Sequence, residues 1–215
     1  MNKLKIRDIL IFISLEILFL FLITIVFFEK NVEINSRYLG TVSLIWYIYS
    51  LTIVLIITRR RNLLSSWFKR ENFLKDFLWS LKVFPILFIS LLILGLLFPV
   101  NDSNYVGVNI KNLDNSQKIL FVVVAIFLGP ITEELIFRGM VYNFLKNFMR
   151  VEVSIIITSL IFALFHSLET FPVILMLSIL MNYFYEIRSN LLVPITLHSL
   201  NNAIALLSLF TLGGV

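Results

Sequence analysis

The sequence ILFVVVAIFLGPITEELIFRGMVYNFL, residues 119–145, decides the class of fold. It is long enough to cross a membrane as a helix, since about 20 apolar residues span a hydrocarbon core about 30 Å thick. Three ionisable residues, Glu133, Glu134 and Arg138, nevertheless lie inside it. Each charge costs about 2.5–3.5 kcal/mol at the centre of a transmembrane helix, so such residues persist in ion pairs, wet cavities or working sites.

Helical spacing separates the two glutamates. Residues four apart share a helix face, so Glu134 and Arg138 can pair, while Glu133 points about 100° away from Glu134. An ion-paired packing cluster would explain Glu134 and Arg138 without any activity. It leaves the carboxylate of Glu133 unexplained.

The whole chain is strongly apolar. Its 215 residues are 59% hydrophobic and include 21 Phe, and the mean hydropathy is +0.95. This composition predicts an all-α, polytopic transmembrane helix bundle that forms a single integral-membrane domain over residues 1–215. About seven spanning helices with an intramembrane active-site cavity are expected, at 9–28, 39–58, 77–99, 119–145, 153–167, 171–187 and 191–210.

The positions of the basic residues predict how the bundle is oriented. Lys and Arg flank the apolar runs, which is their usual topogenic role and argues against nucleic-acid binding despite the net charge of +5. Placing the N-terminus inside puts 12 of the 18 Lys and Arg on the cytoplasmic side. The sequence therefore predicts a multi-pass cell-membrane protein in contact with the lipid bilayer, with its N-terminus inside.

Two connections are also predicted. Residues 63–76, where Trp and Phe alternate with Lys and Arg, are expected to lie along the membrane surface. Residues 101–118 carry Asn, Asp, Ser and Gly and are expected to form a solvated loop.

The only two histidines, His166 and His198, both lie in apolar segments. Phe162 precedes His166 by four residues, and Asn202 follows His198 by four, so each pair shares a helix face. Glu133, His166 and His198 lie 10 to 14 residues from the nearest predicted cytoplasmic charge, which corresponds to depths of about 15 to 21 Å. The three side chains are therefore expected to meet at one level of the membrane.

Together these motifs resemble a known family. Glu133-Glu134-x-x-x-Arg138, Phe162-x-x-x-His166 and His198-x-x-x-Asn202, in this order, are similar to the motifs of the CAAX protease and bacteriocin-processing family, also called the Abi family, whose members are intramembrane proteases. The motifs cover about 129–202, within a family-like core at about 119–210. The resemblance implies an intramembrane endopeptidase related to type II CAAX prenyl endopeptidases.

Other hydrolase patterns are missing from the sequence. It contains no Cys, no His-Glu-x-x-His and no Gly-x-Ser-x-Gly, and no Asp lies in any of the seven predicted apolar runs. Cysteine, zincin-type, serine and aspartyl chemistry are therefore not indicated. Glutamate and histidine remain as bases.

The resemblance implies six catalytic residues, whose roles follow from their chemistry. Glu133 is expected to be the general base for a water held between it and His166. Glu134 and Arg138 would form the orienting pair. His198 and Asn202 would donate hydrogen bonds to the oxyanion, a contribution of about 3 to 4 kcal/mol per donor.

Metal use stays open at this stage. Glu133 and the two histidines would also suit Zn²⁺ with water in the open position. Family members carry the label metalloprotease, but structural work on relatives is usually read as glutamate-dependent hydrolysis without a metal. A mechanism without any cofactor is therefore preferred, with Zn²⁺ as the alternative.

The expected substrate is a membrane-associated peptide or membrane-anchored protein. A composition rich in Ile, Lys, Phe and Asn is typical of a bacterial chain, for which peptide or bacteriocin maturation, or bacteriocin self-immunity, fits better than processing of prenylated proteins. The alternative is a non-catalytic membrane immunity or scaffold protein that retains the fold. A channel or transporter is a third hypothesis, with no repeats or broken-helix pairs to favour it.

Overall fold

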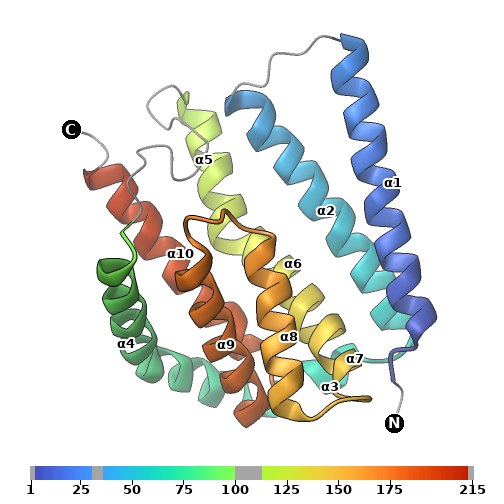
Figure 1. Ribbon diagram of the computed structural model, residues 1–215, viewed down its shortest axis with the longest axis vertical. Helices are drawn as coiled ribbons and strands as arrows, with labels where there is room; N and C mark the ends of the chain where they lie inside the picture. The colour runs from blue at the N-terminus through green and yellow to red at the C-terminus, as the bar shows by residue number, and fades with distance from the viewer. Residues whose placement is uncertain (1–2, 31–35, 100–112, 213–215) are drawn as a thin grey trace.

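The computed structural model describes residues 3–30, 36–99 and 113–212, and within these ranges it contains helices and no strand (Figure 1). The predicted all-α bundle is therefore confirmed. The predicted loop at 101–118 lies largely outside the described residues. Its last four residues belong to a helix instead, because Asp114 and Gln117 form a capping box that begins the helix at Asn115.

The helices follow one another in an up-and-down arrangement (Figure 1). Each predicted apolar run corresponds to one helix or, for residues 119–145, to one continuous series of helical segments. In chain order the elements are α1 (Ile6–Lys30), α2 (Ser36–Arg60), α3 (Leu64–Trp67), η1 (Arg70–Asn72), α4 (Phe73–Leu97), α5 (Asn115–Val123), η3 (Val124–Leu128), α6 (Gly129–Glu134), η4 (Leu135–Tyr142), α7 (Asn143–Leu145), α8 (Val151–Leu164), α9 (Phe171–Arg188) and α10 (Leu192–Leu212).

Six of the seven predicted spans are long and apolar enough to cross a membrane. The seventh, α8, has 14 residues and is therefore about 21 Å long, shorter than a hydrocarbon core of about 30 Å. The prediction of a spanning helix at 153–167 was wrong in length. The apolar residues at its end, Leu164, Phe165 and Leu168, are exposed, and the chain turns there toward α9.

The long helix that runs from α5 to α7 changes its hydrogen bonding at η3, a π-helical segment. Pro130 has no backbone N–H and its ring crowds the preceding turn, so a regular α-helical pattern cannot continue through it. The N–H of Gly129 instead bonds to the carbonyl of Val124, five residues earlier. A second π-helical segment, η4, follows the two glutamates directly.

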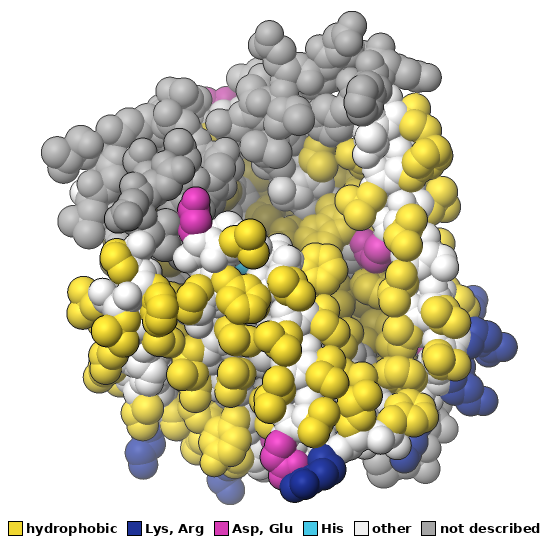
Figure 2. Space-filling view, viewed as in Figure 1, with side chains coloured by type: hydrophobic (Ala, Val, Ile, Leu, Met, Phe, Trp, Pro, Cys, Tyr) yellow, Lys and Arg dark blue, Asp and Glu magenta, His cyan; other side chains and the backbone are white. Residues whose placement is uncertain are grey.

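The surface of the bundle matches a membrane protein. Figure 2 shows hydrophobic side chains over its flank, with Lys and Arg gathered at the end where α8 begins. At this end Arg188 pairs with the buried Asp76 through its Nε, 2.7 Å from Oδ1, and Asn190 donates to the other carboxylate oxygen at 2.7 Å. These contacts fasten the turn between α9 and α10 to the start of α4.

The predicted surface segment is anchored by a buried aromatic side chain. Residues 63–76 form α3, η1 and the first turn of α4, and Phe73 is exposed as expected. Trp67, however, is only 4% exposed. Its ring lies over Gly139 of η4, where a Cβ atom would come within 2.7 Å of it. Glycine at 139 thus lets α3 dock against the long helix.

Candidate active site

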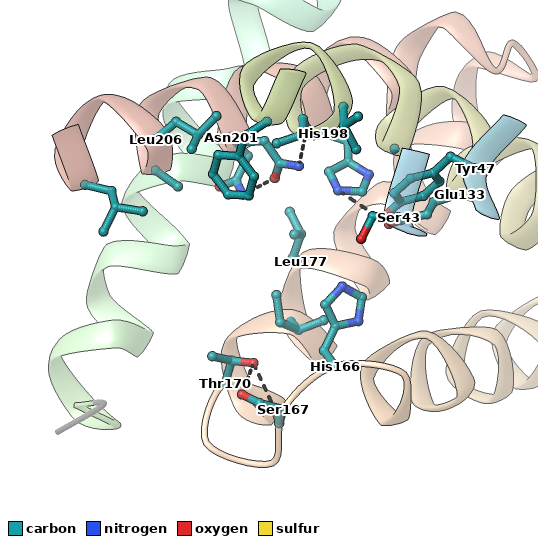
Figure 3. A pocket seen from close by; sticks show the side chains of 18 of the residues that line it. Ser43, Tyr47, Glu133, His166, Ser167, Thr170, Leu177, His198, Asn201 and Leu206 are labelled. Carbon is teal, nitrogen blue, oxygen red and sulfur yellow. Dashed lines mark hydrogen bonds and ion pairs between the residues drawn. The ribbon is translucent and has the colours of Figure 1, made fainter. Parts of the chain in front are cut away.

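A cavity of about 780 Å³ is enclosed by α2, the α5–α6 region, α9, α10 and the end of α8. Four of the six predicted catalytic residues line it: Glu133, His166, His198 and Asn202. Figure 3 shows Glu133 and His198 together on one side of the cavity, with Tyr47 beside them and His166 across the space. Glu134 and Arg138 lie behind this wall and are fully buried.

Glu133 presents one free carboxylate oxygen to this site. Its Oε1 accepts a hydrogen bond of 2.6 Å from the hydroxyl of Tyr47. Its Oε2 is buried, makes no hydrogen bond to a protein group, and lies 3.8 Å from Nε2 of His198. The side chain remains 14% exposed. Oε2 is therefore a buried acceptor without a protein hydrogen-bond partner beside the cavity.

Glu134 and Arg138 form the ion pair that the four-residue spacing predicts, with Nη1 of Arg138 3.0 Å from Oε1 of Glu134. Nη2 of Arg138 also donates to the backbone carbonyl and the hydroxyl of Ser178, at 3.1 and 2.8 Å. The guanidinium carbon lies 4.9 Å from the centre of the Phe162 ring, a cation–π contact. Arg138 thus joins the long helix to α9 and α8.

His198 is fixed by Glu134. Its Nδ1 lies 2.8 Å from Oε1 of Glu134, the same oxygen that Arg138 contacts. A carboxylate oxygen paired with Arg accepts hydrogen bonds, so Nδ1 carries a hydrogen and Nε2 is turned toward Glu133. The carboxylate behind the histidine therefore sets both its tautomer and its orientation.

His166 does not lie on a helix, contrary to the sequence-based prediction. α8 ends at Leu164, and the N–H groups of Phe165 and His166 bond three residues back instead of four. Nδ1 of His166 donates to the carbonyl of Phe162 at 2.9 Å, and the two ring centroids lie 4.7 Å apart in a tilted arrangement. The imidazole closes the end of α8 and leaves its Nε2 as an acceptor.

Asn202 stands one turn beyond His198 on α10, and the π-helical segment explains its position. Nδ2 donates to the carbonyl of Ala125 at 2.9 Å. In the π-helical pattern this carbonyl would receive the N–H of residue 130, which is a proline. The amide of Asn202 supplies the missing donor with one of its two hydrogens, and the other remains for a ligand.

The two histidines have their Nδ1 atoms engaged. Nδ1 of His198 contacts Glu134, and Nδ1 of His166 bonds to a backbone carbonyl, so each ring has Nε2 left for a ligand. Among residues 3–30, 36–99 and 113–212, no group of three or more His, Asp and Glu side chains is arranged to hold a metal ion. Metal use stays a prediction, and the chelation experiment below tests it.

Tyr47 donates a hydrogen bond to Glu133 but is not part of the motifs. It lies on α2, more than 80 residues before the first motif, and its signal in the sequence is only an aromatic hydroxyl within an apolar run. Ser178 was missed for a similar reason, since a serine in an apolar helix often bonds to its own backbone. Both contacts depend on how the helices are rotated against each other.

Residues 115–204 match a protein-family model described as type II CAAX prenyl endopeptidase, Rce1-like. The matched region begins with α5, contains all three motifs, and ends within α10. Searches of curated proteins and of solved structures found no significant match.

Proposed function

We propose that the chain is a CAAX-type intramembrane protease that hydrolyses a peptide bond in a membrane-associated peptide or protein with a water activated by Glu133, on the basis of the family match over residues 115–204. The family assignment itself supports an intramembrane protease. The observation that carries the mechanism is the arrangement of Glu133, with one oxygen held by Tyr47 and the other facing His198 inside the cavity.

In the proposed reaction, Oε2 of Glu133 and Nε2 of His198 hold the attacking water between them. Glu133 takes one proton as the water oxygen bonds to the carbonyl carbon of the substrate. The same proton then passes to the leaving nitrogen as the C–N bond breaks. A carboxylate is suited to both steps because it can act first as a base and then, once protonated, as an acid.

The remaining polar groups support the tetrahedral intermediate. The second Nδ2 hydrogen of Asn202 is a candidate donor to the oxyanion. His166 lies across the cavity from His198, on the other side of the space for the substrate (Figure 3). This scheme gives His198 the water-binding role that the sequence assigned to His166, because His198 rather than His166 lies beside Glu133.

The shape of the cavity favours an extended, apolar substrate. On α10 its lining continues from His198 to Leu209, and the facing side chains of Phe121, Val124 and Leu177 are apolar. Eleven residues of helix correspond to about 16 Å, the length of about five residues of extended chain. Peptide maturation and self-immunity both supply substrates of this kind, and the matched family description adds prenylated C-terminal tails.

The test is cleavage of a library of membrane-associated peptides by the purified protein in detergent, with and without a chelator. Glu133→Gln keeps the shape of the side chain but removes the base, so a loss of about 1000-fold or more in kcat is expected. Chelation should leave cleavage unchanged. Loss of cleavage on chelation, restored by Zn²⁺, would replace this mechanism with a metal-dependent one.

Glu186→Gln is the matched control. Glu186 also accepts a hydrogen bond from a tyrosine, Tyr142, at 2.7 Å, and it lies in the family-matched region but outside the cavity. Its variant should cleave normally. If Glu133→Gln preserved the biological function in cells, the non-catalytic scaffold would be the better description of the protein.

A further inference from the structure

Tyr47 connects the catalytic region to a helix outside the family-matched residues. It is carried by α2, and its hydroxyl donates a 2.6 Å hydrogen bond to Oε1 of Glu133. Its ring lines the same cavity as His166 and His198 (Figure 3). Among the residues that the structure describes, no other hydrogen bond reaches the carboxylate of Glu133, so this contact fixes one of its oxygens.

The surroundings of Tyr47 are shaped to keep the hydroxyl in place. A Cβ atom at Gly129 would lie 3.3 Å from both Cζ and Oη of Tyr47, so glycine there leaves room for the end of the phenol. On the other side, the rings of Trp46 and Tyr47 lie 4.7 Å apart. Trp46 is itself held by Glu16 of α1, which accepts its indole N–H at 2.8 Å.

We propose that Tyr47 is the positioning residue for Glu133: its hydroxyl holds Oε1 so that Oε2 is kept toward His198 and the water. This inference rests on the proposed function. A carboxylate without such a partner can rotate about its last bond, and a rotated Glu133 would no longer face His198. Tyr47 is not required to touch the substrate, so its removal should slow the chemical step without weakening binding.

The principal variant is Tyr47→Phe, which removes the hydroxyl and keeps the ring. A hydrogen bond to a charged group contributes enough for kcat to fall by about 10-fold to 100-fold when it is lost. KM should stay within about twofold. Both constants are measured on protein that elutes as a single folded species, with the melting temperature recorded beside them.

Tyr49→Phe is the matched control. Tyr49 is on the same helix two residues later, on a different face, and its hydroxyl donates to the carbonyl of Leu15 at 2.8 Å. The substitution therefore removes one tyrosine hydrogen bond between α1 and α2 without touching the cavity. It should change kcat by less than about twofold, whatever it does to the melting temperature.

A double-mutant cycle distinguishes positioning from general damage. If Tyr47 acts through Glu133, adding Tyr47→Phe to Glu133→Gln should leave the residual rate unchanged, because the group being positioned is already disabled.

Three results overturn the inference. The first is a kcat for Tyr47→Phe equal to that of Tyr49→Phe. The second is a fall in the residual rate of Glu133→Gln by the same factor that Tyr47→Phe causes in the native protein. The third is a loss of kcat/KM in Tyr47→Phe that lies entirely in KM. Each would leave the protease assignment intact. Full activity of Glu133→Gln would instead refute the proposed role of Glu133, and the positioning role would fail with it.

Discussion

Two adjacent glutamates have different environments in this site, although the sequence presents them as a pair. Glu134 is fully buried and contacts Arg138 and His198 through one oxygen. Glu133, about 100° around the helix, keeps an unpaired oxygen at the wall of the cavity. The chemistry proposed for each follows from these surroundings: a paired carboxylate orients a histidine, and an unpaired one can accept a proton.

Arg138→Lys tests the importance of the buried guanidinium. Lysine keeps the charge but cannot reach Glu134 and both oxygens of Ser178 in one geometry, so buried acceptors lose their partners. We expect the free energy of unfolding to fall by about 1–3 kcal/mol and kcat to fall with it, because His198 loses a fixed support. Thermal unfolding in detergent and the cleavage assay measure the two effects.

Arg150→Lys is the control for that substitution. The side chain of Arg150 is 83% exposed and pairs at 3.4 Å with that of Glu152, which is 67% exposed. Exposed pairs contribute about 0–1 kcal/mol, so this variant should retain both stability and activity. A fully active and stable Arg138→Lys would show that the position requires only a positive charge.

At the residue scale, the sequence predicted the Glu134–Arg138 pair because both lie on one helix, where spacing fixes geometry. It did not predict that His198 would contact both glutamates or that Tyr47 would bind Glu133, since those partners come from other helices. The proposed roles of all six motif residues remain predictions. What the structure adds is which of their atoms face one another.

At the level of elements, the π-helical segments and glycine contacts determine how the site is assembled. Pro130 removes a donor from the long helix, and Asn202 of α10 replaces it. Gly139 removes a side chain, and Trp67 of α3 fills the space. Each irregularity in one helix is thus matched by a contact from another element.

Gly139→Ala tests the docking of α3. The new methyl group would come within 2.7 Å of the Trp67 ring, a rigid group in a buried position, so α3 has to shift. Overpacking of this kind costs about 1–3 kcal/mol. A fall in the melting temperature and easier proteolysis between α2 and α4 are the expected readouts.

Gly95→Ala is the comparison, because nothing lies within 4 Å of a Cβ atom at Gly95 in α4. Alanine in the interior of a helix is favoured over glycine by about 0.5–1 kcal/mol, so this variant should be as stable as the native protein or more so. If both alanine variants behaved alike, α3 would not be anchored by Trp67.

Sequence patterns predicted the existence of the helices better than their ends. Apolar runs located all seven helices, because burial in lipid requires continuous hydrophobicity. They extended α8 over His166, since hydrophobicity continues through Leu164 and Phe165 into a turn that the structure leaves exposed. Trp67 was expected at the surface because Gly139, against which its ring packs, is 72 residues away in the chain.

For the whole molecule, the unequal distribution of Lys and Arg predicts the orientation in the membrane. α8 begins at the end of the bundle where basic residues gather, and α5 begins toward the opposite end (Figures 1 and 2). Arg150 directly precedes α8, and Ser116 is in the first turn of α5. The positive-inside rule assigns the basic end to the cytoplasm.

Because the sequence contains no Cys, single cysteines report accessibility without a background. Ser116→Cys should react with a membrane-impermeant maleimide in intact cells. Arg150→Cys should react only after permeabilisation. The reverse labelling pattern would show that the protein has the opposite orientation, and that the cavity is reached from the other side of the membrane.

The short α8 has a consequence for the supply of the second reactant. Every cleavage consumes one water molecule, and a catalytic centre in the middle of a bilayer would receive it only by diffusion through hydrocarbon. α8 is about 21 Å long, whereas the hydrocarbon core is about 30 Å thick. About 9 Å of the core is therefore not crossed by α8, at the end of the helix next to His166. The short α8 therefore reduces the distance through hydrocarbon that a water molecule has to cross to reach the proposed site.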